Sequence, residues 1–136
     1  MKQILIDTNF LLLPGQYGID ILTQIDALLH ADYEFYVLDE SIKEIQKIIE
    51  TQKGLHKSAA KLALEMIKVN KIKIKDTILI QERKKTTHVD DLLVAIAKAQ
   101  PFQTVIATQD QLLKKRLKEL KIQMIVLRGK THLVLT

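Results

Sequence analysis

Two patterns of hydrophobic and polar positions alternate along this chain. Short apolar runs bounded by polar residues are typical of strands buried on both faces, and they occur at 3–6, 35–38, 104–107 and 122–127. Between these runs, apolar residues recur three or four positions apart, which predicts helices. The expected helices cover 19–29, the stretch from Asp39 or Ser41 to Gly54, the next stretch to about Val69, 89–99 and about 109–120.

Residues 72–80 have a different spacing of apolar positions. Four isoleucines alternate there with mostly polar residues across an expected turn at 76–77: Ile72, Ile74, Ile78 and Ile80. This alternation predicts strand, and a basic polar loop at 83–87 follows it. Helices that alternate with strands apolar on both faces imply an α/β fold. In such a fold a mostly parallel sheet lies between helices and the crossovers are right-handed.

Length and composition narrow the class of protein. A chain of 136 residues with 47% hydrophobic content suffices for one buried core, so we expect a single domain over 1–136. The net charge of +5 comes mostly from lysine and favours a nucleic-acid partner only weakly. Cysteine is absent, which excludes thiolate metal sites and disulfides. No apolar run is long enough for a membrane span, so we expect a cytoplasmic protein.

Acidic residues stand where the expected strands end. Asp7 directly follows the first strand, and Asp110 lies three residues past Ala107. Ligands bind at the carboxyl ends of parallel strands, so these two carboxylates would share one rim. Glu44 and the pair Asp90-Asp91 lie near helix starts and could converge there. Each acid alone could be a helix or turn cap, but together they would repel unless a hard cation such as Mg²⁺ or Mn²⁺ neutralised them.

Four short motifs carry a family resemblance in their order and approximate spacing. They are Ile6-Asp7-Thr8-Asn9-Phe10-Leu11, the segment 37–45 around Glu44, the segment 88–94 around Asp90, and the segment 107–116 around Asp110. Together they resemble the motifs of PIN domains. Residues 13–21 are similar to archaeal relatives of the Fcf-type rRNA-processing nucleases, and toxin-type PIN ribonucleases are neighbours. The resemblance extends from Ile4 to about Val126.

The resemblance implies a three-layer α/β/α, Rossmann-like PIN domain with a mostly parallel central sheet. It implies a Mg²⁺- or Mn²⁺-dependent ribonuclease, an endonuclease of rRNA or another structured RNA. Its catalytic acids would be Asp7, Glu44, Asp90 and Asp110, with Asp91 as a further metal ligand. Asp90 is preferred to Asp91, and Glu44 to Glu40, without excluding either alternative. A homodimer, an antitoxin or a ribosome-assembly partner would fit the same family.

Substrate contacts are expected from two kinds of residue. Hydroxyl and amide groups beside the acids could bind them or a phosphate, and basic residues beside the acidic motifs could bind RNA: Thr8, Asn9, Thr108, Arg83, Lys84, Lys85, Lys114 and Lys115. Capping, or a solvated lysine-rich surface, explains them equally well. His88 could protonate a leaving group, although a lone histidine is more often a surface residue. Aromatic residues make up only 4% of the chain, so base stacking should be minor.

Two other classes of function use a similar pattern. The first is an RNA-binding ribosome-assembly module with little catalysis. The second is another Rossmann-like enzyme with an acid after its first strand. Phosphatases of that kind have a second Asp where Asn9 stands, and phospho-receiver domains have paired acids before the strand-one Asp, so the sequence argues against both.

Overall fold

The computed structural model describes residues 1–30 and 32–136, and these residues form one sheet of six strands. The strand order is β3-β2-β1-β4-β5-β6, in which β1 to β5 are parallel and β6 is antiparallel to β5. The strands are β1 (Lys2–Ile6), β2 (Tyr33–Leu38), β3 (Lys73–Lys75), β4 (Thr104–Ala107), β5 (Gln123–Arg128) and β6 (His132–Leu135). The expected mostly parallel sheet is confirmed.

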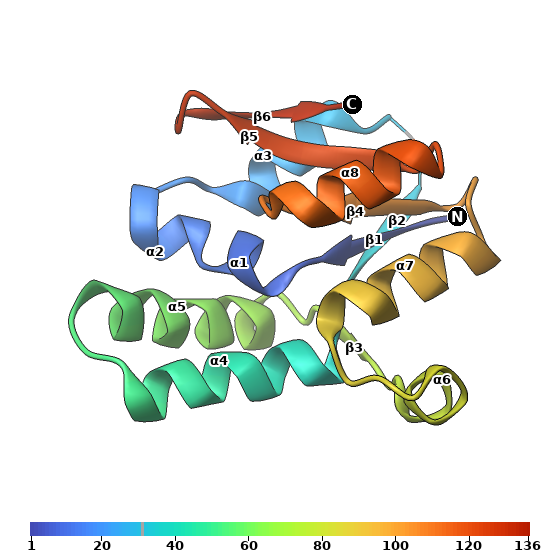
Figure 1. Ribbon diagram of the computed structural model, residues 1–136. Coiled ribbons are helices and arrows are strands. Elements are labelled where there is room, and N and C mark those ends of the chain that lie inside the picture. The colour runs from blue at the N-terminus through green and yellow to red at the C-terminus, as the bar shows by residue number, and fades with distance from the viewer. Residues whose placement is uncertain (31) are drawn as a thin grey trace.

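Eight helices accompany the sheet in the described residues (Figure 1). They are α1 (Thr8–Leu11), α2 (Leu13–Tyr17), α3 (Ile21–Leu28), α4 (Asp39–Thr51), α5 (Leu55–Val69), α6 (Ile78–Lys84), α7 (Val89–Ala99) and α8 (Gln111–Glu119). Within the same residues, none of these helices combines the length and apolar character that a membrane crossing requires.

The sheet separates two hydrophobic cores. Side chains alternate between the faces of a strand, so Ile4 and Ile6 of β1 pack with α1 to α5, while Leu5 packs with α7 and α8. The neighbouring strand β4 repeats the division, with Val105 in the first core and Ile106 in the second. Burial on both faces explains the uninterrupted apolar runs in the sequence. The three-layer α/β/α architecture is therefore confirmed.

The segment after β1 depends on one close helix contact. At Gly15 in α2, an added Cβ would lie 2.4 Å from the Cα of Ala59 in α5. Real carbon atoms do not approach so closely, so only glycine lets these two helices pack at this distance. The contact holds α1 and α2 against the first core and thereby fixes the chain that leaves Asp7.

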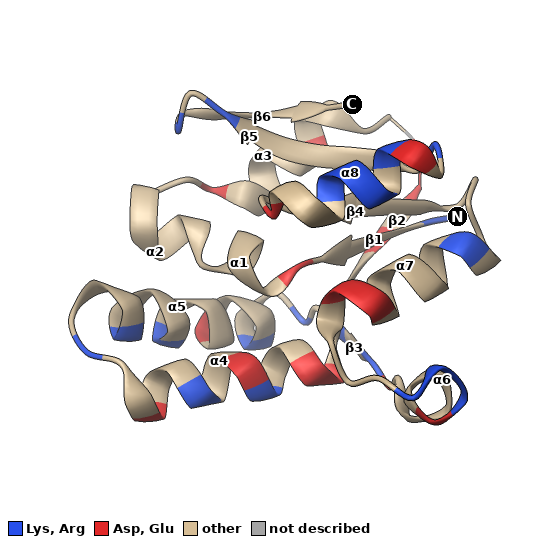
Figure 2. Cartoon of the chain, in the orientation of Figure 1, with Lys and Arg blue, Asp and Glu red and all other residues tan. Residues whose placement is uncertain are grey.

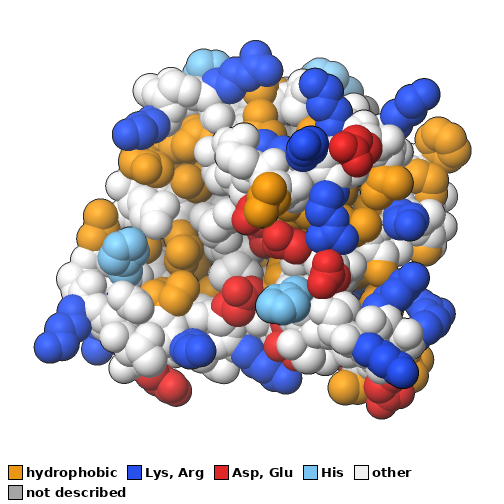
Figure 3. Space-filling model, viewed as in Figure 1, with side chains coloured by type: hydrophobic (Ala, Val, Ile, Leu, Met, Phe, Trp, Pro, Cys, Tyr) orange, Lys and Arg blue, Asp and Glu red, His pale blue; other side chains and the backbone are white. Residues whose placement is uncertain are grey.

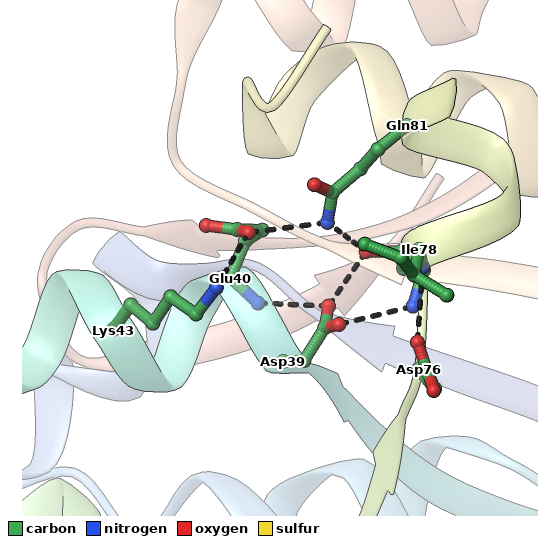
Figure 4. Close-up of polar contacts among 7 residues, drawn as sticks. Asp39, Glu40, Lys43, Asp76, Ile78 and Gln81 are labelled. Carbon is green, nitrogen blue, oxygen red and sulfur yellow. Dashed lines mark hydrogen bonds and ion pairs between the residues drawn. The ribbon is translucent and has the colours of Figure 1, made fainter. Parts of the chain in front are cut away.

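The expected strand over residues 72–80 is only partly right, because β3 is short and α6 begins at Ile78. The carboxylate of Asp39 accepts hydrogen bonds from Thr77 N at 3.1 Å and Thr77 Oγ1 at 2.6 Å (Figure 4). Gln81 Nε2 donates to Glu40 Oε1 at 3.1 Å. These bonds join α6 to the start of α4 and end the strand pattern at the buried Thr77.

Other elements differ from the sequence prediction at their ends. Helix α7 and strand β4 have the predicted bounds, whereas α4 has Leu38 as its N-cap, so the cap expected at Asp39 or Ser41 is wrong. The sequence pattern predicted neither the short helices α1 and α2 nor strand β6. Strand β6 forms because the chain turns at Gly129, where φ is 62°, and returns along β5.

Candidate functional site

The carboxyl ends of β1 and β4 border a hollow of about 460 Å³. Ile6 pairs with Ala107 across the two parallel strands, so the chains that follow them leave the sheet side by side. Five acidic residues from four parts of the chain line this hollow: Asp7, Glu44, Asp90, Asp91 and Asp110. Figure 2 shows acidic segments where β1 ends and where α7 and α8 begin, and Figure 3 shows acidic side chains near the centre of this face. We call this feature the acidic hollow.

Asp7 is the most buried of these acids, with only 4% of its surface exposed. It is the N-cap of α1, where its Oδ1 accepts from Thr8 N at 2.8 Å. Its Oδ2 accepts from Thr108 Oγ1 at 2.7 Å. Burial raises the pKa of Asp7 to about 6, and the charges of Asp90 and Glu44 raise it as well, against the lowering effect of the two hydrogen bonds. A nearby cation would relieve this penalty.

One buried hydroxyl connects Asp7 with the acid after β4. Thr108 Oγ1 donates to Asp7 and accepts from Asp110 N at 3.1 Å. Asp110 is itself the N-cap of α8, where its Oδ1 accepts from Leu113 N at 2.8 Å. Capping therefore holds both strand-end acids in place, and each retains carboxylate lone pairs that can bind a ligand.

The structure brings Glu44, and not Glu40, to the acidic hollow. Thr8 Oγ1 donates to Glu44 Oε1 at 2.8 Å, which ties α4 to the start of α1. Glu40 is directed to α6, where its Oε1 accepts from Gln81, and the same oxygen accepts from Lys43 of α4 (Figure 4). Because Glu40 is already paired outside the acidic hollow, the contacts agree with the preference for Glu44.

Asp90 and Asp91 both line the acidic hollow but have different surroundings. Asp91 accepts from Thr86 Oγ1 and from Arg116 Nη1, each at 2.9 Å, and these two bonds lower its pKa. Asp90 is half-buried, and burial followed by the charge of Asp110 raises its pKa, while Arg116 opposes this. The side chain of Asp91 is thus occupied by protein partners, which favours Asp90 as the residue that meets a ligand.

The residues expected to contact substrate fall in different places. Thr8, Asn9 and His88 line the acidic hollow, and Asn9 Oδ1 accepts from Gln109 N at 3.4 Å. The basic residues expected beside the cleft do not line it: Arg83, Lys84, Lys85, Lys114 and Lys115. Arg83 and Lys84 instead end α6. Their contact with RNA stays a prediction.

Comparison with known proteins decides the family. The chain matches the family model described as "PIN like domain" over residues 4–130. It belongs to this family. Within it, the chain is 28% identical to ribonuclease VapC4 of Methanocaldococcus jannaschii over 134 residues, which cover 97% of this chain and 95% of that protein. The structure of the PIN domain endonuclease Utp24 matches with a TM-score of 0.75 at 21% identity. The matched region covers 98% of this chain and 90% of the Utp24 chain, and the match shows that the two share the PIN fold.

The donor set of this PIN chain can be tested against a divalent cation. No three His, Asp or Glu side chains in the described residues already converge as a ligand group. The available donors are carboxylate and hydroxyl oxygens, which suit a hard ion such as Mg²⁺ or Mn²⁺. The raised pKa values of Asp7 and Asp90 show that negative charge is crowded and partly desolvated here. The chemistry of these oxygen donors therefore fits a hard divalent cation.

The hydroxyl groups expected to bind the acids do so: Thr8 donates to Glu44 and Thr108 donates to Asp7. The ion pair between Arg116 and Asp91 was not foreseen from the sequence. A signal for it existed, because at 100° per residue Arg116 lies on the opposite side of α8 from Lys114 and Lys118.

Proposed function

We propose that this PIN-family protein is a Mg²⁺- or Mn²⁺-dependent ribonuclease that cleaves phosphodiester bonds in rRNA or another structured RNA as an endonuclease. The observation that carries the proposal is the buried carboxylate of Asp7, which Thr108 links to Asp110 in a hollow shared with Asp90 and Glu44. Relatives named as a ribonuclease and as an endonuclease support the same activity.

The proposed roles follow from burial and hydrogen bonding. Asp7, Asp90 and Asp110 would hold the cation, with Glu44 binding a second ion or orienting water, and Asp91 serving as an auxiliary ligand. A bound cation would lower the pKa of water and polarise the phosphoryl oxygen. Thr108 keeps Asp7 and Asp110 together, and Thr8 aims Glu44 at the same hollow.

The substrate phosphate would meet cationic and polar groups at the rim. Arg116 lines the acidic hollow beside Asp91, and its side chain is 44% exposed, so it can also reach a ligand in solvent. His88 lines the same rim and could donate a proton to a leaving oxygen. Arg116 would thus reduce the repulsion between the acids and an approaching RNA phosphate.

The wider biological setting is part of the proposal. We take residues 1–136 as one catalytic domain of a cytoplasmic protein. The PIN relatives leave two settings open. In one, the chain is the toxin of a toxin–antitoxin pair and an antitoxin covers the site. In the other, the chain acts on rRNA with a ribosome-assembly partner. A homodimer fits either setting.

A cleavage assay tests the activity. Structured rRNA fragments, linear and circular, are incubated with Mn²⁺ or Mg²⁺ and with wild type, Asp7→Asn or Asp110→Asn. Glu65→Gln, an exposed acid on α5, is the matched control. We expect wild type and the control to cleave both RNA forms, and the two Asn variants to be slower by roughly 100-fold or more.

Each of the other outcomes has a definite meaning. Equal cleavage by all four proteins would exclude the acidic hollow as the catalytic site. Cleavage of the linear RNA alone would show that the protein is an exonuclease and not an endonuclease. Absence of cleavage by any protein, with RNA binding retained, would favour the RNA-binding assembly module.

A further inference from the structure

A second hollow of about 520 Å³ lies at the opposite edge of the sheet, where the parallel strands begin. Residues from the starts of β1, β4 and β5 line it, together with the loop before β4, the end of α8 and Thr136 after β6. Its cationic residues are Lys2, Lys118 and Lys121, and no Asp or Glu side chain lines it in the described part of the chain. We call this feature the lysine hollow.

An aromatic side chain stands at the lysine hollow. Phe102 lies in the turn between α7 and β4, and 90% of its surface is exposed. It is the most exposed of the large hydrophobic residues in the described chain. No other part of the described chain covers this ring, so the ring contributes nothing to the hydrophobic core. An exposed aromatic face next to several cations is a typical platform for a nucleic-acid base.

A row of lysines follows α8 from the end of the helix that carries Asp110 to the lysine hollow, on the side of α8 opposite Arg116. Lys114, Lys118 and Lys121 follow Asp110 at intervals of three or four residues, so they share one face of α8 and its C-terminal turn. Figure 2 shows the basic segments of the α8 ribbon. Lys118 lies eight residues after Asp110, which is roughly 12 Å along the helix.

We propose that the lysine hollow is a second RNA-binding site, which holds a base and its phosphate from the same strand that the acidic hollow cleaves. The base stacks on Phe102, the phosphates lie beside Lys118 and Lys121, and the intervening strand follows the lysine row of α8. This inference rests on the proposed function for the identity of the strand. It names a substrate class: RNA with a single-stranded segment next to the cut.

Continuity favours RNA over an acidic protein segment as the occupant. The lysine row starts at Asp110, a residue of the proposed catalytic site, and ends in the lysine hollow. A single polyanion with regularly spaced phosphates can occupy the whole path. An acidic peptide would satisfy the lysines but would have no reason to extend toward a cluster of carboxylates, which repel it.

The test measures binding of 5′-labelled single-stranded RNAs of about 2 and about 12 nucleotides by fluorescence anisotropy in EDTA, where no cleavage occurs. We expect the longer RNA to bind wild type at least about tenfold more tightly, because only it can reach both hollows. Phe102→Ala should weaken binding of the longer RNA by roughly 5- to 100-fold, whereas Phe102→Tyr, which keeps the ring, should stay within about twofold.

Charge variants supply the second readout. Lys118→Glu combined with Lys121→Glu should weaken binding and reduce the log–log salt dependence by roughly 0.7 for each lost phosphate contact. Lys61→Glu, a matched exposed lysine on α5, should bind RNA like wild type. Circular dichroism of each variant shows whether it is folded.

Three results would overturn the proposal. The first is wild-type binding of the longer RNA by Phe102→Ala. The second is equal affinity of wild type for both RNA lengths. The third is tighter, Phe102-dependent binding of an alternating Glu-Leu peptide, which would assign the lysine hollow to a protein partner. The cleavage assay tests the proposed function independently. If RNA binding does not depend on Phe102 but cleavage occurs, only the second RNA-binding site is excluded. If binding depends on Phe102 but no cleavage occurs, only the proposed nuclease activity is excluded.

Discussion

The two edges of the parallel sheet carry opposite chemistry. At the carboxyl edge, residues that follow strands place Asp7 and Asp110 in the acidic hollow, while at the amino edge, residues that precede strands place Phe102 and Lys121 in the lysine hollow. Parallel strands send all their like ends to one edge, so the position of a residue before or after a strand decides its edge. The comparison teaches that strand direction decides which of these side chains share an edge.

The two edges also differ in their electrostatic energy. Asp7 is buried among other carboxylates, which raises its pKa to about 6 and makes its ionised form unfavourable without a cation. The cations of the lysine hollow, by contrast, include the exposed Lys118 and Lys121, whose charges remain solvated. Neutralising a buried acid at the carboxyl edge should therefore raise the free energy of unfolding, whereas neutralising an exposed lysine at the amino edge should leave it nearly unchanged. The following predictions test this contrast, beginning with the largest effect.

The pH dependence of stability should come chiefly from the carboxyl edge. The pKa of Asp7 rises from 3.8 to about 6 on folding, so the folded state holds its proton more tightly. This contribution to the free energy of unfolding is present below about pH 4 and is lost as pH rises through about 6, a decrease of about 3 kcal/mol at 1.36 kcal/mol per pKa unit. Urea unfolding in EDTA at several pH values measures it.

Asp7→Asn isolates this effect from the other titrating groups. The variant should lose less stability than wild type as pH rises, so the difference between the two curves should change by about 3 kcal/mol between pH 4 and 7. Asp76→Asn, an exposed acid before α6, serves as the control. A pH-independent difference between wild type and Asp7→Asn would show that Asp7 has an ordinary pKa.

Divalent cations should stabilise the carboxyl edge alone. Mn²⁺ at about one hundred times its dissociation constant should raise the free energy of unfolding by about 2.7 kcal/mol, because only the folded chain assembles the acids. Thermal unfolding with Mn²⁺, against Na⁺ at equal ionic strength, measures the rise. Asp110→Asn should abolish it, and Lys121→Glu should retain it. Equal stabilisation of both variants would place the ion outside the acidic hollow.

A scaffold change should destabilise the protein without altering this contrast. Gly15→Ala places a methyl group 2.4 Å from Ala59 Cα, which α5 must move to accommodate. The expected loss is about 2 kcal/mol of unfolding free energy by chemical denaturation, typical of overpacking. The Mn²⁺ stabilisation should remain, with Gln16→Ala as the control in the same helix. Unchanged stability of Gly15→Ala would mean that α2 and α5 pack less closely.

The smallest effect concerns the rim of the acidic hollow. Arg116→Gln removes an exposed ion pair with Asp91 and should cost less than about 1 kcal/mol. It should also raise the pKa of Asp90 further, since Arg116 lowers it. Carbon-detected NMR titration of the Asp90 carboxyl in EDTA measures the shift, with Lys115→Gln as the control. An unchanged Asp90 titration would show that Arg116 does not influence the charge of Asp90.

Much of the fold could be predicted because it depends on local periodicity. Apolar runs predicted β1, β2, β4 and β5, and helical spacing predicted α7 with its observed bounds. The same reading assigned Ile78 and Ile80 to a strand, although they lie in α6. Alternation at every second position could not reveal that Asp39 binds Thr77 from 38 residues away and ends the strand there. Long-range hydrogen bonds override the local pattern at this point.

The sequence by itself determined the order of strands and helices and the gathering of acids at one edge, because strand direction follows from the alternation of elements. Only the tertiary structure decided that Glu44 and not Glu40 reaches the hollow, and that Asp91 but not Asp90 is paired with Arg116 and Thr86 there. Arg116 and Thr86 donate hydrogen bonds to Asp91, and Gln81 donates one to Glu40. Asp90 and Glu44 do not make these bonds, so their carboxylates remain available in the acidic hollow. Side-chain partners are chosen by packing between distant segments, which periodicity along a single segment does not encode.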